Sequence, residues 1–77
     1  MNERKMTFGE RAVGLTFNPS GEPLVHELKA SAALFIEHCH QERELTKDPE
    51  VKRMYSLAIT AVQEAQMWAV KAATWRP

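Results

Sequence analysis

The stretch LTKDPE, residues 45–50, carries the signals of a tight turn between two helices. The Asp48 carboxylate can accept hydrogen bonds from the free N–H groups of a helix start, and Pro49 fits the first helical position. Glu50 complements the positive end of the helix dipole. A connection this short makes its two helices antiparallel neighbours. The stretch therefore predicts a helical hairpin.

Apolar residues recur at spacings of three and four on both sides of this turn, which is the pattern of an amphipathic helix. Before the turn, the pattern predicts a helix over residues 23–44. Its main apolar stripe consists of Leu24, Leu28, Ala32, Phe35 and Cys39, widened by Val25, Ala33 and Ile36. After the turn, it predicts a helix over residues 49–75. The main stripe there consists of Met54, Ala58, Ala61, Ala65, Trp68 and Ala72.

The apolar surface of the second helix is wider than the arc of about 100° that one neighbouring helix covers. Apolar surface that the chain itself does not cover usually marks an interface with another molecule. The chain has 77 residues, which build only a marginal core, and its single cysteine, Cys39, excludes an internal disulfide. We therefore expect a compact homo-oligomer, with Trp68 used in packing and Trp75 at a subunit contact. A lone thiol also suits a reducing compartment such as the cytoplasm.

A shorter helical segment is predicted within residues 1–13, over residues 3–13, although Gly9 weakens it. Residues 14–22 then form an irregular loop that contains TFNPSG, residues 16–21. Pro19 disfavours helical backbone at the residue before it, and Ser20 is placed to cap the helix that begins at Pro23. The sequence thus predicts an all-α chain with one domain, residues 1–77, built as a short N-terminal helix, a loop and a long antiparallel hairpin.

The composition excludes several partners. Ten basic side chains balance ten acidic ones, for a formal net charge of zero, whereas proteins that bind DNA or RNA polymers usually show a basic excess. No apolar run approaches the roughly 18 residues that cross a membrane. The mixed charges of MNERKMTFGER, residues 1–11, do not fit a secretory signal. We expect neither nucleic-acid polymers nor a membrane as partners.

Two constellations suggest chemistry only at first sight. His38 and His40 point in directions about 200° apart around a helix, so they do not converge on a metal, and we expect two solvated histidines beside a core Cys39. Ser31 and His26 could be read as a nucleophile and its base. However, the sequence around Ser31 is not that of a nucleophile elbow, and a two-helix hairpin offers no cleft that excludes water. We therefore expect no metal, no cofactor and no enzymatic activity.

The loop before residue 23 has a more specific pattern. Asn18, Ser20 and backbone N–H groups lie at the positive end of the following helix. Such a helix end is a favourable binding site for a phosphate. Lys29 and Ser31 follow about two turns into that helix, and Phe17 offers a ring on which a base can stack. A capped turn beside a surface lysine fits the same residues, and the pattern leaves both interpretations open.

Four segments, taken together and in this order, resemble the bacteriophage anti-CBASS sponges, whose helical hairpin is shared with the Thoeris-counteracting sponges. The segments are Asn18-Pro19-Ser20-Gly21, Glu27-Leu28-Lys29, Leu57-Ala58-Ile59-Thr60 and Gln66-Met67-Trp68-Ala69-Val70-Lys71-Ala72. The resemblance runs from about Gly14 to Trp75. It implies a small α-helical protein that assembles into homohexamers. It also implies sequestration of cyclic oligonucleotide messengers, without cleavage, in the cytoplasm of the infected host.

The same resemblance implies which residues bind the ligand. Cyclic dinucleotides lie between paired subunits in the family, and cyclic trinucleotides occupy separate pockets at another junction. The groups concerned fall on Phe17, Asn18, Lys29 and Ser31 of this chain, beside Ser20. A further arginine contacts the trinucleotide in relatives, and Arg53 and Arg76 are its candidates here. Some relatives carry a tyrosine near this loop, where Phe17 keeps a stacking face without a hydroxyl.

A second function remains open from the sequence. The alanine- and tryptophan-rich face of the 49–75 helix also suits a regulatory module that binds another protein. A phosphodiesterase acting on the same ligands is disfavoured because the sequence shows neither a metal cluster nor an acid–base pair.

Overall fold

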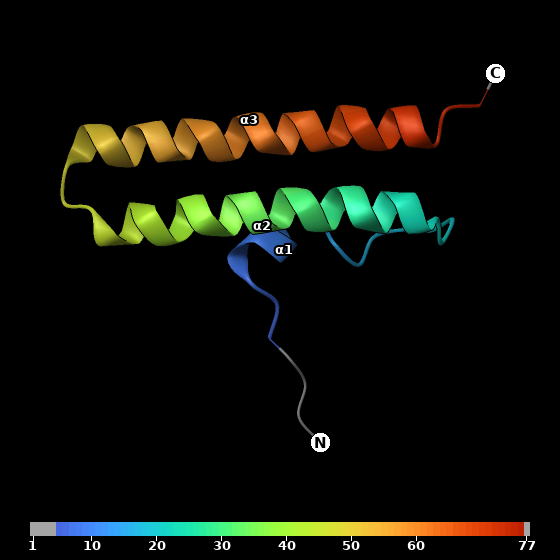
Figure 1. The fold of residues 1–77 in the computed structure, drawn as a ribbon, viewed down its shortest axis with the longest axis horizontal. Coiled ribbons are helices and arrows are strands. Elements are labelled where there is room, and N and C mark those ends of the chain that lie inside the picture. Colours follow the sequence, from blue (N-terminus) through green and yellow to red (C-terminus); the bar gives the residue numbers. More distant parts are fainter. Residues whose placement is uncertain (1–4, 77) are drawn as a thin grey trace.

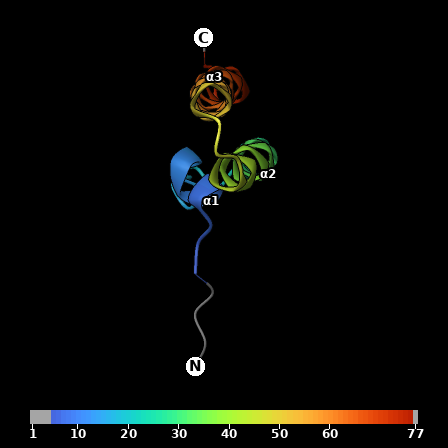
Figure 2. The ribbon, with the colours of Figure 1, turned by 90° about the vertical axis from the view of Figure 1, so that its left-hand side faces the viewer.

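The computed structural model describes residues 5–76, and these form three helices and no strand. Helix α1 spans Phe8–Val13, α2 spans Pro23–Leu45 and α3 spans Pro49–Ala73. The two long helices are antiparallel, with α1 beside α2 on the side away from α3 (Figures 1 and 2). The all-α hairpin that the sequence predicts is confirmed. None of the helices in residues 5–76 is long and apolar enough to cross a membrane.

The turn between α2 and α3 forms as LTKDPE predicts. The Asp48 carboxylate accepts a hydrogen bond of 2.9 Å from the backbone N–H of Glu50, and Pro49 occupies the first helical position. The last turn of α2 ends at Thr46, whose N–H donates to the Glu42 carbonyl at 3.1 Å. Across the turn, the Lys52 ammonium donates to the Arg43 carbonyl at 2.9 Å. The Glu50 N–H at the start of α3 and the Arg43 carbonyl at the end of α2 therefore both have partners, although helix ends lack intrahelical ones.

Helix α1 is shorter than predicted. Thr7 and Glu10 form a capping box: the Thr7 hydroxyl accepts from the Glu10 N–H, and the Glu10 carboxylate accepts from the Thr7 N–H, both at 3.0 Å. A capping box fixes a helix start, so the helix begins at Phe8 rather than at residue 3. Residues 1–4 of the predicted segment lie outside the described part of the chain.

Helix α1 lies against α2 at Gly9. A Cβ atom on Gly9 would be 2.1 Å from the carbonyl oxygen of Ala33, so only glycine permits this approach. The Gly9 N–H donates to the Glu37 carboxylate at 2.9 Å. Beside this contact, the rings of Phe8 and His40 stack at 4.3 Å between centroids. His40 is therefore packed rather than solvated, which corrects the expectation from sequence.

The core is small and lies along one face of α2. Its buried apolar residues are Val13, Val25, Ala33, Ile36, Cys39 and Ile59, and only Ile36 is fully enclosed, at 0% exposure. The prediction for this helix is confirmed in part: Cys39 of the main stripe and the widening residues Val25, Ala33 and Ile36 are buried, whereas Leu24 and Phe35 of the main stripe are exposed. The apolar arc is wide enough to fit two adjacent stripes, and the positions of α1 and α3 decide which one is buried.

Helix α3 buries a different face from the predicted one. Ile59 and Gln66 are its buried residues, whereas Trp68, expected to pack, is 70% exposed in the single chain. The predicted stripe points away from α2; of its members, Met54, Ala61, Ala65, Trp68 and Ala72 are exposed and Ala58 is half-buried.

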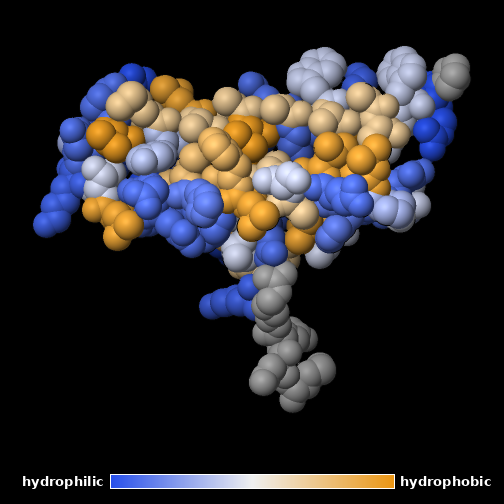
Figure 3. All heavy atoms as spheres, viewed as in Figure 1, coloured by the Kyte–Doolittle hydropathy of each residue, from blue (hydrophilic) through white to orange (hydrophobic). Residues whose placement is uncertain are grey.

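The molecule is one helix thick. Its shortest principal-axis extent is 12 Å, which is about the diameter of a single helix with side chains. Figure 2 shows this as a stack of α3, α2 and α1 in one layer. Apolar residues also spread across the broad face shown in Figure 3. A one-layer arrangement cannot cover both faces of its helices, so much apolar surface stays exposed.

We predict that Gly9→Ala destabilises the protein. Helix propensity alone favours alanine by roughly 1 kcal/mol. Overlap of the new methyl group with the Ala33 carbonyl should reverse that sign and lower the free energy of unfolding by about 1–3 kcal/mol. Urea denaturation followed by circular dichroism measures the change. Arg11→Ala, at an exposed position of α1, is the matched control and should change little; stabilisation by Gly9→Ala would contradict the close approach.

Candidate functional site

The first part of the loop is fixed by the way α1 ends. Gly14 adopts a left-handed conformation with φ of 62°, and its N–H donates to the Arg11 carbonyl at 3.2 Å. The N–H of Leu15 donates to the Glu10 carbonyl at 3.0 Å. These two bonds form a Schellman motif, in which glycine is favoured at the left-handed position. The chain therefore reverses sharply after Val13 and returns toward α2.

The second part of the loop is a turn built from Asn18-Pro19-Ser20-Gly21. The Gly21 N–H donates to the Asn18 carbonyl at 3.0 Å, and Gly21 has φ of 66°. The Asn18 side chain donates to the Glu22 carbonyl at 2.9 Å. Glu22 is the N-cap residue of α2 and forms no side-chain cap hydrogen bond. The expectation that Ser20 caps this helix is therefore wrong, and its hydroxyl is not used in that way.

The side chain of Lys29, on α2, forms hydrogen bonds with the backbone of the loop. Its side chain is buried, with 5% of the residue exposed. The ammonium donates to the Gly14 carbonyl at 3.0 Å and also to the Phe17 carbonyl, and it lies 5.4 Å from the centroid of the Phe17 ring. Among residues 5–76, no carboxylate forms an ion pair with it. The surface lysine considered from the sequence is thus a buried cation that is satisfied only in part.

An open cavity of about 540 Å³ lies between this loop and the end of α3. Its walls are Phe17, Asn18, Pro19, Ser20, Val25, Lys29, Val70 and Thr74. Phe17 is 71% exposed, so its ring is available to a ligand or to another chain. Volumes of 300–1,000 Å³ are usual for small-molecule sites. The cavity combines a flat aromatic side chain, a buried cation and short polar side chains.

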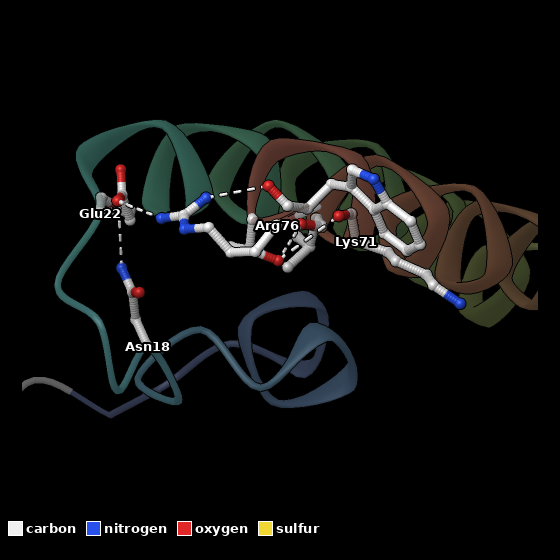
Figure 4. A network of polar contacts seen from close by, with 7 residues as sticks. Asn18, Glu22, Lys71 and Arg76 are labelled. Carbon is white, nitrogen blue, oxygen red and sulfur yellow. Dashed lines mark hydrogen bonds and ion pairs between the residues drawn. The ribbon is translucent and has the colours of Figure 1, made fainter.

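The end of α3 is connected to the same loop. The Arg76 guanidinium lies 3.6 Å from the Glu22 carboxylate, and the Asn18 side chain bonds to the Glu22 carbonyl (Figure 4). The Thr74 hydroxyl donates to the Val70 carbonyl at 2.9 Å. Arg76 is largely exposed and Glu22 partly so, and an ion pair in such a position contributes little to stability. It does place a second cation at this end of the hairpin.

The predicted site residues fall into two groups. Phe17, Asn18, Ser20 and Lys29 line the cavity together. Ser31 is exposed farther along α2 and does not line it. Arg53 lies near the start of α3, at the opposite end of the hairpin, where it forms a 2.7 Å ion pair with Glu50. The hydrogen bond from Arg53 lowers the pKa of the Glu50 carboxyl, and both side chains are exposed.

Sequence reasoning missed Val25, Val70 and Thr74 as cavity residues. The antiparallel hairpin turns at about residue 47, so a residue near position 20 lies opposite one near position 74; this signal was present in the sequence. The burial of Lys29 also had a signal, because it continues the stripe of Val25 and Ala33 at intervals of four. A lysine within an apolar stripe indicates a buried ammonium that needs partners.

In residues 5–76, no group of three or more His, Cys, Asp or Glu side chains is placed to hold a metal ion. Cys39 is buried as a free thiol within the core cluster. His38 is exposed, while His40 packs on Phe8 and lies 3.1 Å from the Arg43 guanidinium through Nδ1.

Comparison with known proteins identifies one family. The family model described as the Acb2/Tad1 hairpin domain matches residues 10–74. That range begins within α1 and includes the loop, both long helices and every residue that lines the cavity. No significant match was found among curated proteins or among solved structures.

We predict that Lys29→Met loosens the loop while the hairpin stays folded. The variant keeps the apolar stem and removes the ammonium from the Gly14 and Phe17 carbonyls. Hydrogen bonds to a charged group contribute about 1.5–3 kcal/mol each. Amide hydrogen exchange at Phe17, whose N–H donates to the Gly14 carbonyl at 2.9 Å, should therefore become at least about 10-fold faster, since the loss of one such bond alone corresponds to about 10- to 150-fold.

The matched control is Lys71→Met, at an exposed lysine on α3, which should leave exchange at Phe17 unchanged. The amide of Ile36, in the core of α2, reports whether the hairpin itself has opened. Unchanged protection of Phe17 in Lys29→Met would show that the buried ammonium does not shape the loop.

Proposed function

This chain belongs to the Acb2/Tad1 hairpin family, the family of the anti-CBASS and anti-Thoeris sponges, and from this premise we propose that it binds and sequesters cyclic oligonucleotide immune messengers without cleaving them. In this proposal the protein acts in the cytoplasm of the infected host. There it keeps the messenger from its effector and so blocks CBASS signalling. Cyclic dinucleotides are the first expected ligands, and cyclic trinucleotides the second.

The buried ammonium of Lys29 is the observation that carries this proposal. It faces a cavity, it has backbone carbonyls as partners, and no carboxylate among residues 5–76 neutralises it. Burying a cation without a counter-charge is costly, and an anionic oxygen in the cavity would offset that cost. A phosphodiester supplies such an oxygen, and a bond from an ammonium to it is roughly twice as strong as a neutral one.

The other cavity residues fit the remaining parts of a cyclic nucleotide. The exposed Phe17 ring offers a face for a base, while Asn18 and Ser20 offer polar groups on the adjacent turn. We assign Lys29 to the phosphate and Phe17 to a base. Ser31 and Arg53 lie outside the cavity of one chain, so we assign them only to pockets that combine several chains of the proposed homo-oligomer.

Sequestration requires tight binding rather than chemistry. A loop held by a Schellman motif and by the Lys29 ammonium is ordered before the ligand arrives, which reduces the entropy lost on binding. Slow release then follows from the same order, since affinity differences reside mostly in the dissociation rate. The alternative, a regulatory module that binds another protein through α3, stays a hypothesis without a specific contact in its favour.

We predict that Phe17→Ala weakens the binding of cyclic nucleotides by about 5- to 150-fold, because stacking on an aromatic ring contributes about 1–3 kcal/mol per base. Phe17→Tyr keeps the ring and should bind nearly as well as the unaltered protein. Isothermal titration calorimetry with a panel of cyclic di- and trinucleotides measures both variants. The panel also identifies the preferred ring size.

Phe35→Ala removes a comparable exposed ring that does not line the cavity and serves as the control. Equal loss of affinity in the Phe17 and Phe35 variants would point to a general effect on folding or assembly. No heat with any cyclic nucleotide, for a protein shown to be folded, would remove the proposed function.

A further inference from the structure

The face of α3 that points away from α2 is apolar along most of its length. Its exposed members are Met54, Leu57, Ala61, Ala65, Trp68 and Ala72, which we call the outer face. Ile59 and Gln66, the buried residues of α3, lie on the opposite side of the helix. Residues 54, 61 and 68 are seven apart, as are 65 and 72, so the outer face has the heptad spacing of a helix–helix seam.

We propose that a second copy of this chain packs on the outer face, with its α3 antiparallel and the two-fold axis at Ala61. This inference rests on the homo-oligomer of the proposed function and specifies one of its contacts. Helix α3 spans Pro49–Ala73, so Ala61 is twelve residues from each end. A two-fold axis there pairs the helices over their full length of about 37 Å.

The side chains of the outer face are complementary in size about Ala61. At four residues on either side, Leu57 of one copy lies opposite Ala65 of the partner. At seven residues on either side, Met54 lies opposite the partner's Trp68, and thioether–aromatic contacts are favourable. Ala61 meets its own copy at the axis, where its small side chain lets two backbones approach closely. Each large side chain thereby faces either a small or a compatible one.

Charge favours the antiparallel direction. Lys71 lies ten residues after Ala61, and Glu50 lies eleven residues before it. An antiparallel pair therefore brings Lys71 of one copy beside Glu50 of the partner, at both ends of the seam. A parallel pair in register would place Lys71 beside Lys71 and Glu50 beside Glu50, which is unfavourable. Glu50 already accepts from Arg53 within its own chain, so the partner's Lys71 would join an existing ion pair.

The position of α3 makes a second copy the best occupant. Helix α3 lies at one edge of the single layer, so no other helix of residues 5–76 covers the outer face (Figure 2). The side chains of the outer face are complementary to those of a second, antiparallel copy in both size and charge. A two-fold contact requires such self-complementarity, whereas binding of an unrelated partner does not. The outer face also lies on a different side of α3 from Val70, which lines the ligand cavity, so pairing need not block the loop.

Disulfide cross-linking tests this geometry. All variants carry Cys39→Ala, so that the introduced cysteine is the only one. Disulfides need Cα atoms less than about 7 Å apart. Ala61→Cys should form a covalent dimer under mild oxidation. Leu57→Cys alone should not, because two copies of residue 57 would be about 12 Å apart along the seam.

A mixture of Leu57→Cys and Ala65→Cys chains, distinguished by mass, should form the mixed dimer in preference to either self-dimer. Self-dimers of Leu57→Cys and of Ala65→Cys would indicate a parallel seam and overturn the proposal. The absence of an Ala61→Cys dimer, or a single copy in sedimentation at micromolar concentration, would overturn it as well.

Titration of the cross-linked Ala61→Cys dimer with cyclic nucleotides separates this inference from the proposed function. A dimer that forms and binds no cyclic nucleotide would leave the seam in place and remove the sponge activity. Single copies that bind a cyclic nucleotide would overturn the seam and leave the sponge activity in place.

Discussion

The contact on which the loop and its cavity depend is the one between the Lys29 ammonium and the carbonyls of Gly14 and Phe17. It joins the end of α1, the loop and the first half of α2 through one charged group. These bonds fix the backbone on either side of Phe17, and among residues 5–76 no carboxylate pairs with the cation beside the cavity. In the proposed function, the same buried cation both shapes the loop and binds the phosphate of the ligand. The close approach at Gly9 supports this arrangement, because it holds α1 against α2.

A second constraint is the single-layer architecture. Three helices in one layer bury only a small core around Ile36 and leave large apolar side chains on both long helices exposed. Small chains commonly stabilise themselves through disulfides, metals or oligomers. Cys39 is the only cysteine, and residues 5–76 contain no metal-binding cluster. In the proposed homo-oligomer, association between copies would cover part of this apolar surface and would place the loops of several chains in a shared environment.

Much of the fold was predictable because its signals are local. LTKDPE specifies a helix end, a cap and a helix start within six residues, and the structure confirms each. Which face of each long helix is buried was harder to predict from the sequence. The apolar arcs of α2 and α3 are wide, so spacing alone did not show that Phe35 and Trp68 face outward. The loop residues Phe17, Asn18, Ser20 and Lys29 were found as a group, whereas Thr74 was not, because it comes from the far end of the chain.

Sequestration without cleavage can be measured by native mass spectrometry of the protein after incubation with cyclic di- and trinucleotides, followed by denaturation and analysis of the released ligand. We expect an oligomer that carries cyclic nucleotide and releases it with its mass unchanged. A protein that retains none of the rings offered would contradict the claim of binding. Release of a linear product, heavier by one water, would contradict sequestration without cleavage.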